Sequence, residues 1–228
     1  MMWVRTGWGK ALELLIDHVL LAVPAIVLIA VISVPVGYLA SRHRRMGNLI
    51  LVCTSVLYAV PSLPMLIILP ALLGVSLRST LSMVSALTLY GIAIFVRTAA
   101  DAFSAVSTSV KDTSLAIGYS LRERFWYVEL PLAIPLLAAG LRVVAVSTVG
   151  LVTIGALVGV SSLGTLFTDG FQRGIFAEVM AGLLLTVLLA LAVDRLIVMV
   201  GRKLTPWTRV SEVSSASAPV QRKAGAQV

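Results

Sequence analysis

Long apolar runs separated by short polar clusters divide this chain of 228 residues. A helix that crosses the hydrocarbon core of a membrane needs about 20 mainly apolar residues, because each residue adds about 1.5 Å and the core is ~30 Å thick. The pattern therefore predicts an all-α integral membrane protein with five transmembrane helices. These are Leu20 to Ala40, about Gly47 to Leu69, about Ser79 to Thr98, about Leu132 to Val158, and about Ile175 to Val200.

The second apolar run is too long for one straight helix. Met46 to Leu77 carries no charge, and three prolines divide it. We expect a span that ends near Leu69, followed by a short connection that is partly embedded in the membrane. Because a proline frees a carbonyl that lipid cannot satisfy, Pro61 and Ser62 are predicted to line a translocation path; a packing kink is the alternative.

Polar segments flank a transmembrane domain predicted to cover residues 19–204. Residues 1–18 contain charges and two tryptophans and predict an N-terminal interfacial segment, with no removable signal peptide. The longest polar stretch between spans is 101–131. Residues 205–228 are rich in Ser, Ala and Val without an apolar face, which predicts a disordered cytoplasmic tail.

The distribution of Lys and Arg beside the spans predicts the orientation of the chain, since cytoplasmic loops carry an excess of these residues. The richer side is taken as cytoplasmic, which places the N-terminus outside and the C-terminus inside. It receives Arg42, Arg44, Arg45, Lys111, Arg122, Arg124, Arg202, Lys203 and Arg209, whereas the other side receives Arg5, Lys10, Arg78 and Arg173.

Composition supports a membrane protein and argues against other classes. Hydrophobic residues make up 59% of the chain and charged residues 12%. The formal net charge of +8 does not indicate nucleic-acid binding, because the basic residues form short clusters without interleaved aromatic residues. One cysteine, Cys53, allows no disulfide within the chain.

The sequence predicts neither a catalytic residue nor a metal site. His18 and His43 are both expected at the ends of spans, so an intramembrane His ligand set or catalytic base is not predicted. No GxxxxGK[ST] loop occurs, so ATP must bind to another chain. A secondary transporter, which would normally need more spans in a repeated topology, and a small membrane enzyme remain alternatives.

The segment from Lys111 to Pro131 is the most informative polar stretch. Asp112, Leu115 and Ala116 can share a short helix, after which Gly118 supplies a flexible or left-handed corner. Pro131 can begin the next membrane helix without an unsatisfied donor. We expect this helix to lie parallel to the membrane and to dock a partner, with an ordinary amphipathic loop as the alternative.

The spacing in this segment resembles the cytoplasmic signature of binding-protein-dependent ABC permeases. That signature has Glu-Ala-Ala, then Gly at the sixth position after Glu, then Leu-Pro ending thirteen residues past that Gly. This chain has Asp112-Thr113-Ser114, Gly118 and Leu130-Pro131, with Asp in place of Glu and Thr-Ser in place of Ala-Ala. The resemblance implies that the residues that couple to the ATPase are Asp112, Thr113, Ser114, Ala116, Gly118, Leu121, Leu130 and Pro131.

Other motifs are similar to those of the osmoprotectant permeases in this family. They are Val60-Pro61-Ser62-Leu63, Leu87-Thr88-Leu89-Tyr90, Ala139-Gly140-Leu141-Arg142, the run Ile154 to Gly159, and Arg202 with Leu204-Thr205-Pro206. Where the family usually has Gly-Ala-Gly-Gly-Leu-Gly, this chain has Gly159-Val160-Ser161-Ser162-Leu163-Gly164. The resemblance implies the type I ABC importer permease fold in the bacterial cytoplasmic membrane.

The same resemblance implies a function and a set of partners. The substrate would be a small compatible solute such as glycine betaine, choline or carnitine, with another small substrate such as an amino acid as the alternative. Partners would be ABC ATPase subunits, a second permease subunit, an extracytoplasmic substrate-binding protein and membrane lipid. The chain itself would bind no cofactor, since ATP and Mg would bind to the ATPase.

Two further hypotheses concern the fourth and fifth spans. Thr148 and Gly155 share a helical face that could line the translocation path or a two-subunit interface, with packing inside the subunit as the alternative. Arg142 is costly within a membrane, so it is expected to snorkel to the cytoplasmic interface or to pair with a carboxylate such as Asp194.

Overall fold

The structure is a computed structural model that describes residues 7–207, and every regular element in that range is a helix. The predictions for Arg5, for Arg209 and for most of the tail at 205–228 fall outside the described residues. In chain order the α-helices are α2 (Trp8–Arg42), α3 (Arg44–Ala59), α4 (Ser62–Leu73), α5 (Thr80–Ser104), α6 (Thr108–Ala116), α7 (Leu121–Arg124), α8 (Leu130–Ile154), α9 (Gly164–Gln172) and α10 (Phe176–Leu204).

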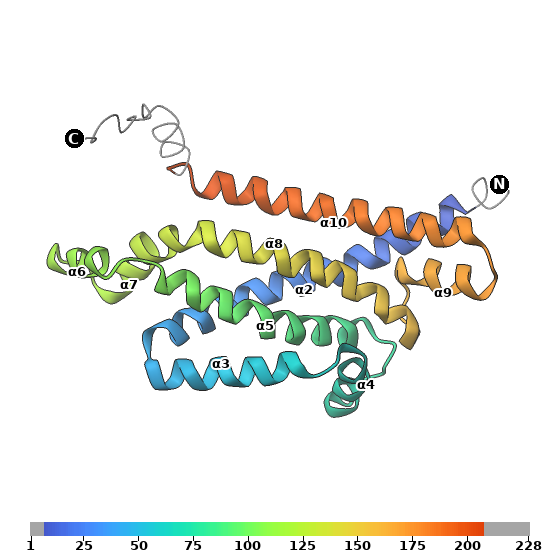
Figure 1. Cartoon of the computed structure of the whole chain (residues 1–228), viewed down its shortest axis with the longest axis horizontal. Helices are drawn as coiled ribbons and strands as arrows, with labels where there is room; N and C mark the ends of the chain where they lie inside the picture. Colours follow the sequence, from blue (N-terminus) through green and yellow to red (C-terminus); the bar gives the residue numbers. More distant parts are fainter. Residues whose placement is uncertain (1–6, 208–228) are drawn as a thin grey trace, which may run out of the picture.

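Four helical stretches are long and apolar enough to cross a membrane, and the pair α3 and α4 makes a fifth if the bent pair is one span. Figure 1 shows α2, α5, α8 and α10 running along the same long axis, with α3 beside them. The start of α2 and the end of α10 lie at opposite ends of this bundle. This arrangement agrees with the predicted five-span architecture.

Helix α2 is longer than the apolar run that predicted it. It begins at Trp8 and continues without a break through Pro24 and Pro35 to Arg42. His18, which was expected at the end of a span, instead lies inside this helix and is fully buried, with Nε2 3.1 Å from the carbonyl oxygen of Val149. The interfacial location of residues before 19 stays a prediction, but residues 8–18 are structurally part of α2.

The second span was wrongly predicted as one helix from about Gly47 to Leu69. Helix α3 ends at Ala59, and α4 leaves it at an angle of 108°. Val60 and Pro61 have extended backbones with ψ of 125° and 141°. A residue before proline is disfavoured in the helical region, and proline itself cannot donate a backbone hydrogen bond, so the chain turns here.

Two other elements differ from the sequence-based expectation. The fourth span begins well before Leu132, because α7, a π-helical turn over Phe125–Glu129 and α8 form one continuous stretch that a 3-10 turn extends to Val158. A short helix, α9, was not predicted, because nine residues that include glycines and an aspartate carry no long apolar run. It packs beside the first half of α10.

The core of the bundle is made by α2, α5 and α8. Ile29, Phe95, Phe103, Ala133 and Val144 form one buried apolar cluster between these helices. Gly37 permits close approach of α2 and α5, because a Cβ at this position would overlap the side chain of Ala99. Outward-facing positions are also apolar, for example Leu20, Val31, Leu72, Val143 and Leu184. Such an exterior is suited to a bilayer rather than to water.

Candidate functional site

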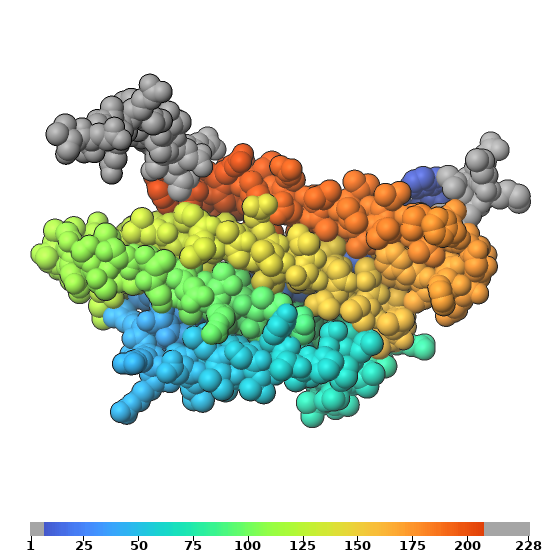
Figure 2. All heavy atoms as spheres, in the orientation of Figure 1, coloured from blue at the N-terminus to red at the C-terminus, as the bar shows by residue number. Residues whose placement is uncertain are grey.

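Helices α6 and α7, with the corner between them, form an elbow at one end of the bundle. We use "elbow" for residues 108–124, which lie at the left of Figures 1 and 2. Helix α6 ends at Ala116, and Gly118 has φ of 98°, in the left-handed region that L side chains rarely adopt. Gly118 donates its N–H to the carbonyl of Leu115, and Tyr119 donates to that of Ser114. The predicted left-handed corner at Gly118 is confirmed.

One side-chain hydrogen bond attaches α6 to the rest of the subunit, and a second lies within α6. Lys111 Nζ donates a hydrogen bond of 3.0 Å to the carbonyl oxygen of Phe103 near the end of α5. Ser114 is 4% exposed, and its hydroxyl donates to the carbonyl of Lys111 over 2.7 Å. Lys111 therefore attaches α6 to α5 through a hydrogen bond. The sequence had indicated only that this lysine contributes to the positive charge of the cytoplasmic side.

Helix α7 starts with a capping box. The Ser120 hydroxyl accepts from the N–H of Glu123, while the Glu123 carboxylate accepts from the N–H and hydroxyl of Ser120 at 2.8 Å and 2.7 Å. These hydrogen bonds favour the ionised carboxylate, first the one from the hydroxyl, and so lower the pKa of Glu123 below its ordinary value. The cap fixes the direction in which the chain leaves the elbow.

A buried ion pair joins the elbow to α8. Arg124 Nε lies 2.5 Å from Glu129 Oε1, and the two side chains are 11% and 4% exposed. The pair spans the π-helical turn that precedes Pro131, where Leu130 donates to the carbonyl of Phe125. A proline ring conflicts with the carbonyl four residues earlier in an α-helix, so the wider turn lets the helix continue past Pro131.

An aromatic cluster supports the same junction from inside the bundle. The ring centroid of Tyr38 on α2 lies 5.1 Å from that of Phe103 on α5 and 4.5 Å from that of Phe125. Arg42 donates to the Tyr38 hydroxyl over 2.6 Å, and so the cluster reaches the polar end of α2. Aromatic pairs of this kind stabilise by about 0.5 to 1.5 kcal/mol beyond their area burial. The elbow is therefore attached to α2, α5 and α8.

The residues predicted to couple to a partner separate into two groups. Asp112, Thr113, Ala116, Gly118 and Leu121 are exposed, and beside them Leu115 and Ile117 are 42% and 70% exposed. The second group packs inward: Ser114 is buried, whereas Leu130 and Pro131 are half-buried in the first turn of α8. The first group can touch another chain, and the second can only transmit the position of the elbow to α8.

The residues predicted for the translocation path lie in different surroundings. Ser62 is half-buried and borders a small cavity with Leu87, Tyr90 and Leu151, while Pro61 is exposed. Tyr90 also contacts Tyr58, with ring centroids 5.5 Å apart. The bend between α3 and α4 thus has one aromatic residue with a hydroxyl, Tyr90, beside it on α5.

Thr148 and Gly155 pack inside the subunit. Thr148 is 2% exposed and donates to the carbonyl of Val144 over 2.8 Å. A Cβ at Gly155 would lie 2.8 Å from Met83 Cε. This geometry corresponds to the packing alternative left open by the sequence, and a contact of either residue with a path stays a prediction.

Arg142 pairs with Asp194, as one of the two sequence-based alternatives predicted. Arg142 Nε and Nη2 donate to the two carboxylate oxygens over 2.6 Å and 3.0 Å. This bidentate ion pair links α8 to α10. A paired arginine is far less costly near a membrane than an isolated one.

The end of the bundle away from the elbow carries a polar surface. Lys10 on α2 and Asp169 on α9 form an ion pair of 2.8 Å. Shallow hollows on either side of Gly159 to Ser161 are lined by polar side chains, including Asp17, Arg78, Thr168 and Gln172. Within residues 7–207, no group of three or more His, Cys, Asp or Glu side chains could hold a metal ion.

Comparison with known proteins identifies the family. The family described as binding-protein-dependent transport system inner membrane component matches residues 33–206. The chain belongs to this family and is a multi-pass permease subunit of an ATP-driven import system in the cytoplasmic membrane. Proteins of this family are transport permeases, and ATP hydrolysis belongs to the partner ATPase subunits.

Individual relatives and structures agree with this assignment. The osmoprotectant import permease protein OsmW of Salmonella typhimurium is 29% identical over 201 residues, which cover 87% of this chain and 93% of OsmW. The glycine betaine/carnitine/choline permease protein OpuCD of Bacillus subtilis is 28% identical over 199 residues, 87% of this chain and 86% of OpuCD. The inward-facing MetNI methionine ABC transporter has a TM-score of 0.71 at 20% identity, covering 85% of this chain and 97% of the MetNI chain. The chain therefore has the fold of a type I ABC importer permease.

Proposed function

We propose that this permease pairs with a second permease subunit and is driven by two ATPase subunits that bind the exposed face of its elbow. The observation that carries the proposal is the elbow surface, where the carboxylate of Asp112 and the apolar side chains of Leu115, Ile117 and Leu121 are all exposed. Apolar residues on a polar segment at the end of a membrane bundle indicate a protein contact. The orientation with this end in the cytoplasm follows the bias of Lys and Arg.

The anchoring of the elbow supports a mechanical role. When the ATPase subunits close on ATP, a force on α6 passes through the Arg124–Glu129 pair and the continuous helix into α8. Helix α8 then carries α10 through the Arg142–Asp194 pair. The spans thereby alternate access between the two sides of the membrane.

For the substrate we propose a small quaternary amine of the osmoprotectant class. The support is the similarity over 87% of the chain to permeases named for osmoprotectants and for glycine betaine, carnitine and choline. Substrate would arrive on a binding protein at the polar end near Lys10 and Asp169, and the bend at Pro61 and Ser62 would border the path. An amino acid is the second candidate, because the fold is shared with a methionine transporter.

The decisive experiment replaces Gly118 with valine in the assembled transporter. A side chain at φ of 98° is strained, but nothing lies within 4 Å of the added Cβ, so the chain should still fold. Twisting the corner should lower ATP-driven uptake of glycine betaine into proteoliposomes by tenfold or more. Basal ATP hydrolysis should persist while its stimulation by loaded binding protein is lost.

Gly74→Val is the matched control. Gly74 also has positive φ, 66°, and open space around it, but it ends α4 and lines neither the elbow nor the polar hollows. We expect near-normal uptake in this variant. Normal uptake and stimulation in Gly118→Val would refute the coupling role, whereas uptake of methionine and not of glycine betaine by the wild type would refute the substrate class alone.

A further inference from the structure

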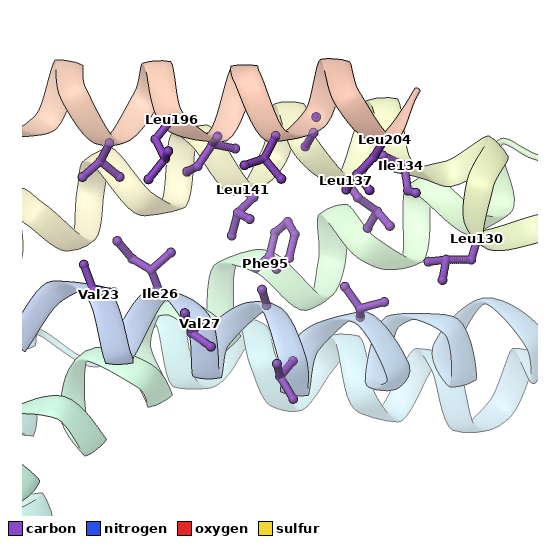
Figure 3. A pocket seen from close by; sticks show the side chains of 18 residues that line it. Val23, Ile26, Val27, Phe95, Leu130, Ile134, Leu137, Leu141, Leu196 and Leu204 are labelled. Atoms are coloured by element: carbon purple, nitrogen blue, oxygen red, sulfur yellow. The ribbon is translucent and has the colours of Figure 1, made fainter. Parts of the chain in front are cut away.

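An apolar groove lies between α2, α8 and α10, apart from the bend in α3 and α4, and its lining extends as far as Leu130 in the first turn of α8. Its volume is about 460 Å³, and its lining includes Val27 and Val31 from α2, Leu137 from α8, and Leu196 and Val200 from α10. Phe95 of α5, which is 1% exposed, closes its floor. In Figure 3, labelled side chains such as Ile26 of α2, Leu141 of α8 and Leu196 of α10 lie between the facing helices.

The groove exists because α10 is attached along only one side. Helix α10 packs on α8 and α9, whereas α2 packs mainly on α5, α8 and α3. Val23 to Val34 and Val193 to Leu204 therefore face each other across a gap. All the residues that line the gap are apolar, so it offers no partner to a polar solute, and leaving it to water would be unfavourable.

Charge at one end of the groove indicates the kind of occupant. Lys203 follows the groove residue Leu196 by seven residues, two helical turns, and so lies on the same stripe of α10. Arg202 and Lys203 are exposed and form no ion pair with any residue in the described range 7–207. In the predicted orientation this end faces the cytoplasmic leaflet, whose lipids are partly anionic.

We propose that the groove binds one anionic phospholipid of the inner leaflet, with an acyl chain against Phe95 and the headgroup beside Lys203. The volume is within the range of about 300 to 1,000 Å³ that is typical of small-molecule sites. The occupant would connect α10 to α2 where protein contacts are missing, and this does not depend on which solute the transporter carries.

Native mass spectrometry of the intact transporter tests the proposal, after exchange in mild detergent and addition of phosphatidylglycerol or phosphatidylcholine. Val27→Trp should fill the groove and lower retained phosphatidylglycerol by at least tenfold. Leu28→Trp is the matched control, because Leu28 is the next residue on α2, is 41% exposed and does not line the groove. Equal retention in these two variants would overturn the site.

Two further experiments test the preference for an anionic headgroup and the identity of the occupant. Lys203→Gln should weaken retention of phosphatidylglycerol about fivefold and leave phosphatidylcholine unchanged, whereas Arg45→Gln on α3 should change neither. Equal retention of the two lipids by the wild type would overturn the anionic assignment. A photo-crosslinking side chain at position 27 should yield a lipid adduct, and an adduct to a second polypeptide would refute lipid as the occupant. All these readouts are independent of uptake.

Discussion

Pro61 and Pro131 present the same chemical problem in two regions, and the chain resolves it in opposite ways. At Pro61 the helix stops, the backbone becomes extended over Val60 and Pro61, and α4 departs at 108°. At Pro131 the helix continues. A π-helical turn before it accommodates the proline ring and its lack of a backbone N–H, and a buried ion pair bridges that turn. Proline alone therefore does not decide whether a membrane helix breaks; the neighbouring contacts do.

The difference also assigns mechanical properties to the two regions. In the proposed mechanism, the continuous helix with its buried ion pair transmits displacement from the elbow to α8. A break between two short helices permits local bending beside the cavity of Ser62 and Tyr90. The following predictions test this contrast.

Removal of Glu129 should have the largest effect. In Glu129→Ala the Arg124 side chain, which is only 11% exposed, loses its ion-pair partner. Removing one member of a buried ion pair lowers the free energy of unfolding by about 3 to 5 kcal/mol. We expect a marked fall in the thermal unfolding midpoint of the detergent-purified subunit. The double variant Arg124→Leu with Glu129→Leu should recover most of the stability, and failure to recover would show that the pair is not the source of the loss.

Replacement of the two prolines should separate transmission from bending. In Pro131→Ala the new N–H can bond to the carbonyl of Tyr127, so the π-turn should revert to α-helix, which rotates the elbow relative to α8. Uptake should fall severalfold while the protein stays folded. Pro61→Ala should change uptake less, because Val60 and the packing of α4 on α5 still hold the bend. A larger loss of uptake in Pro61→Ala would reverse the contrast.

The smallest effect is expected at the capping box. Ser120→Ala removes two hydrogen bonds of the Ser120 hydroxyl, so the pKa of Glu123 should rise toward its ordinary value. Because the folded pKa is the lower one, the contribution of this cap is complete above the unfolded pKa of about 4.3 and is lost as pH falls through the folded pKa. Carbon-13 NMR of the Glu123 carboxyl measures the shift, and an unchanged pKa in Ser120→Ala would refute the cap as its cause.

The sequence predicted the features that depend on local pattern. The length of the apolar runs predicted the spans at α5 and α10. The ability of glycine to adopt positive φ predicted the corner at Gly118. The Arg142–Asp194 pair followed from the cost of an unpaired charge in a membrane. The correct class of transporter followed from spacing in the elbow together with the resemblance.

Features that depend on contacts between distant segments could not be predicted. Continuity through Pro131 requires the π-turn and the Arg124–Glu129 pair, which a search for apolar runs does not detect. The packing of Tyr38 on Phe103 and Phe125 joins residues far apart in the chain. His18 was misplaced because α2 extends beyond its apolar run into a segment whose buried face is visible only after folding.

The bend after α3 has a consequence for how the subunit stands in the membrane. Sixteen residues of helix rise only about 24 Å, less than the ~30 Å of hydrocarbon that must be crossed. The chain consequently changes direction while still at nonpolar depth, and a bare turn there cannot be left against fatty acyl tails. We therefore expect the backbone polar atoms of this bend to be covered by α5, by a second permease subunit or by trapped water.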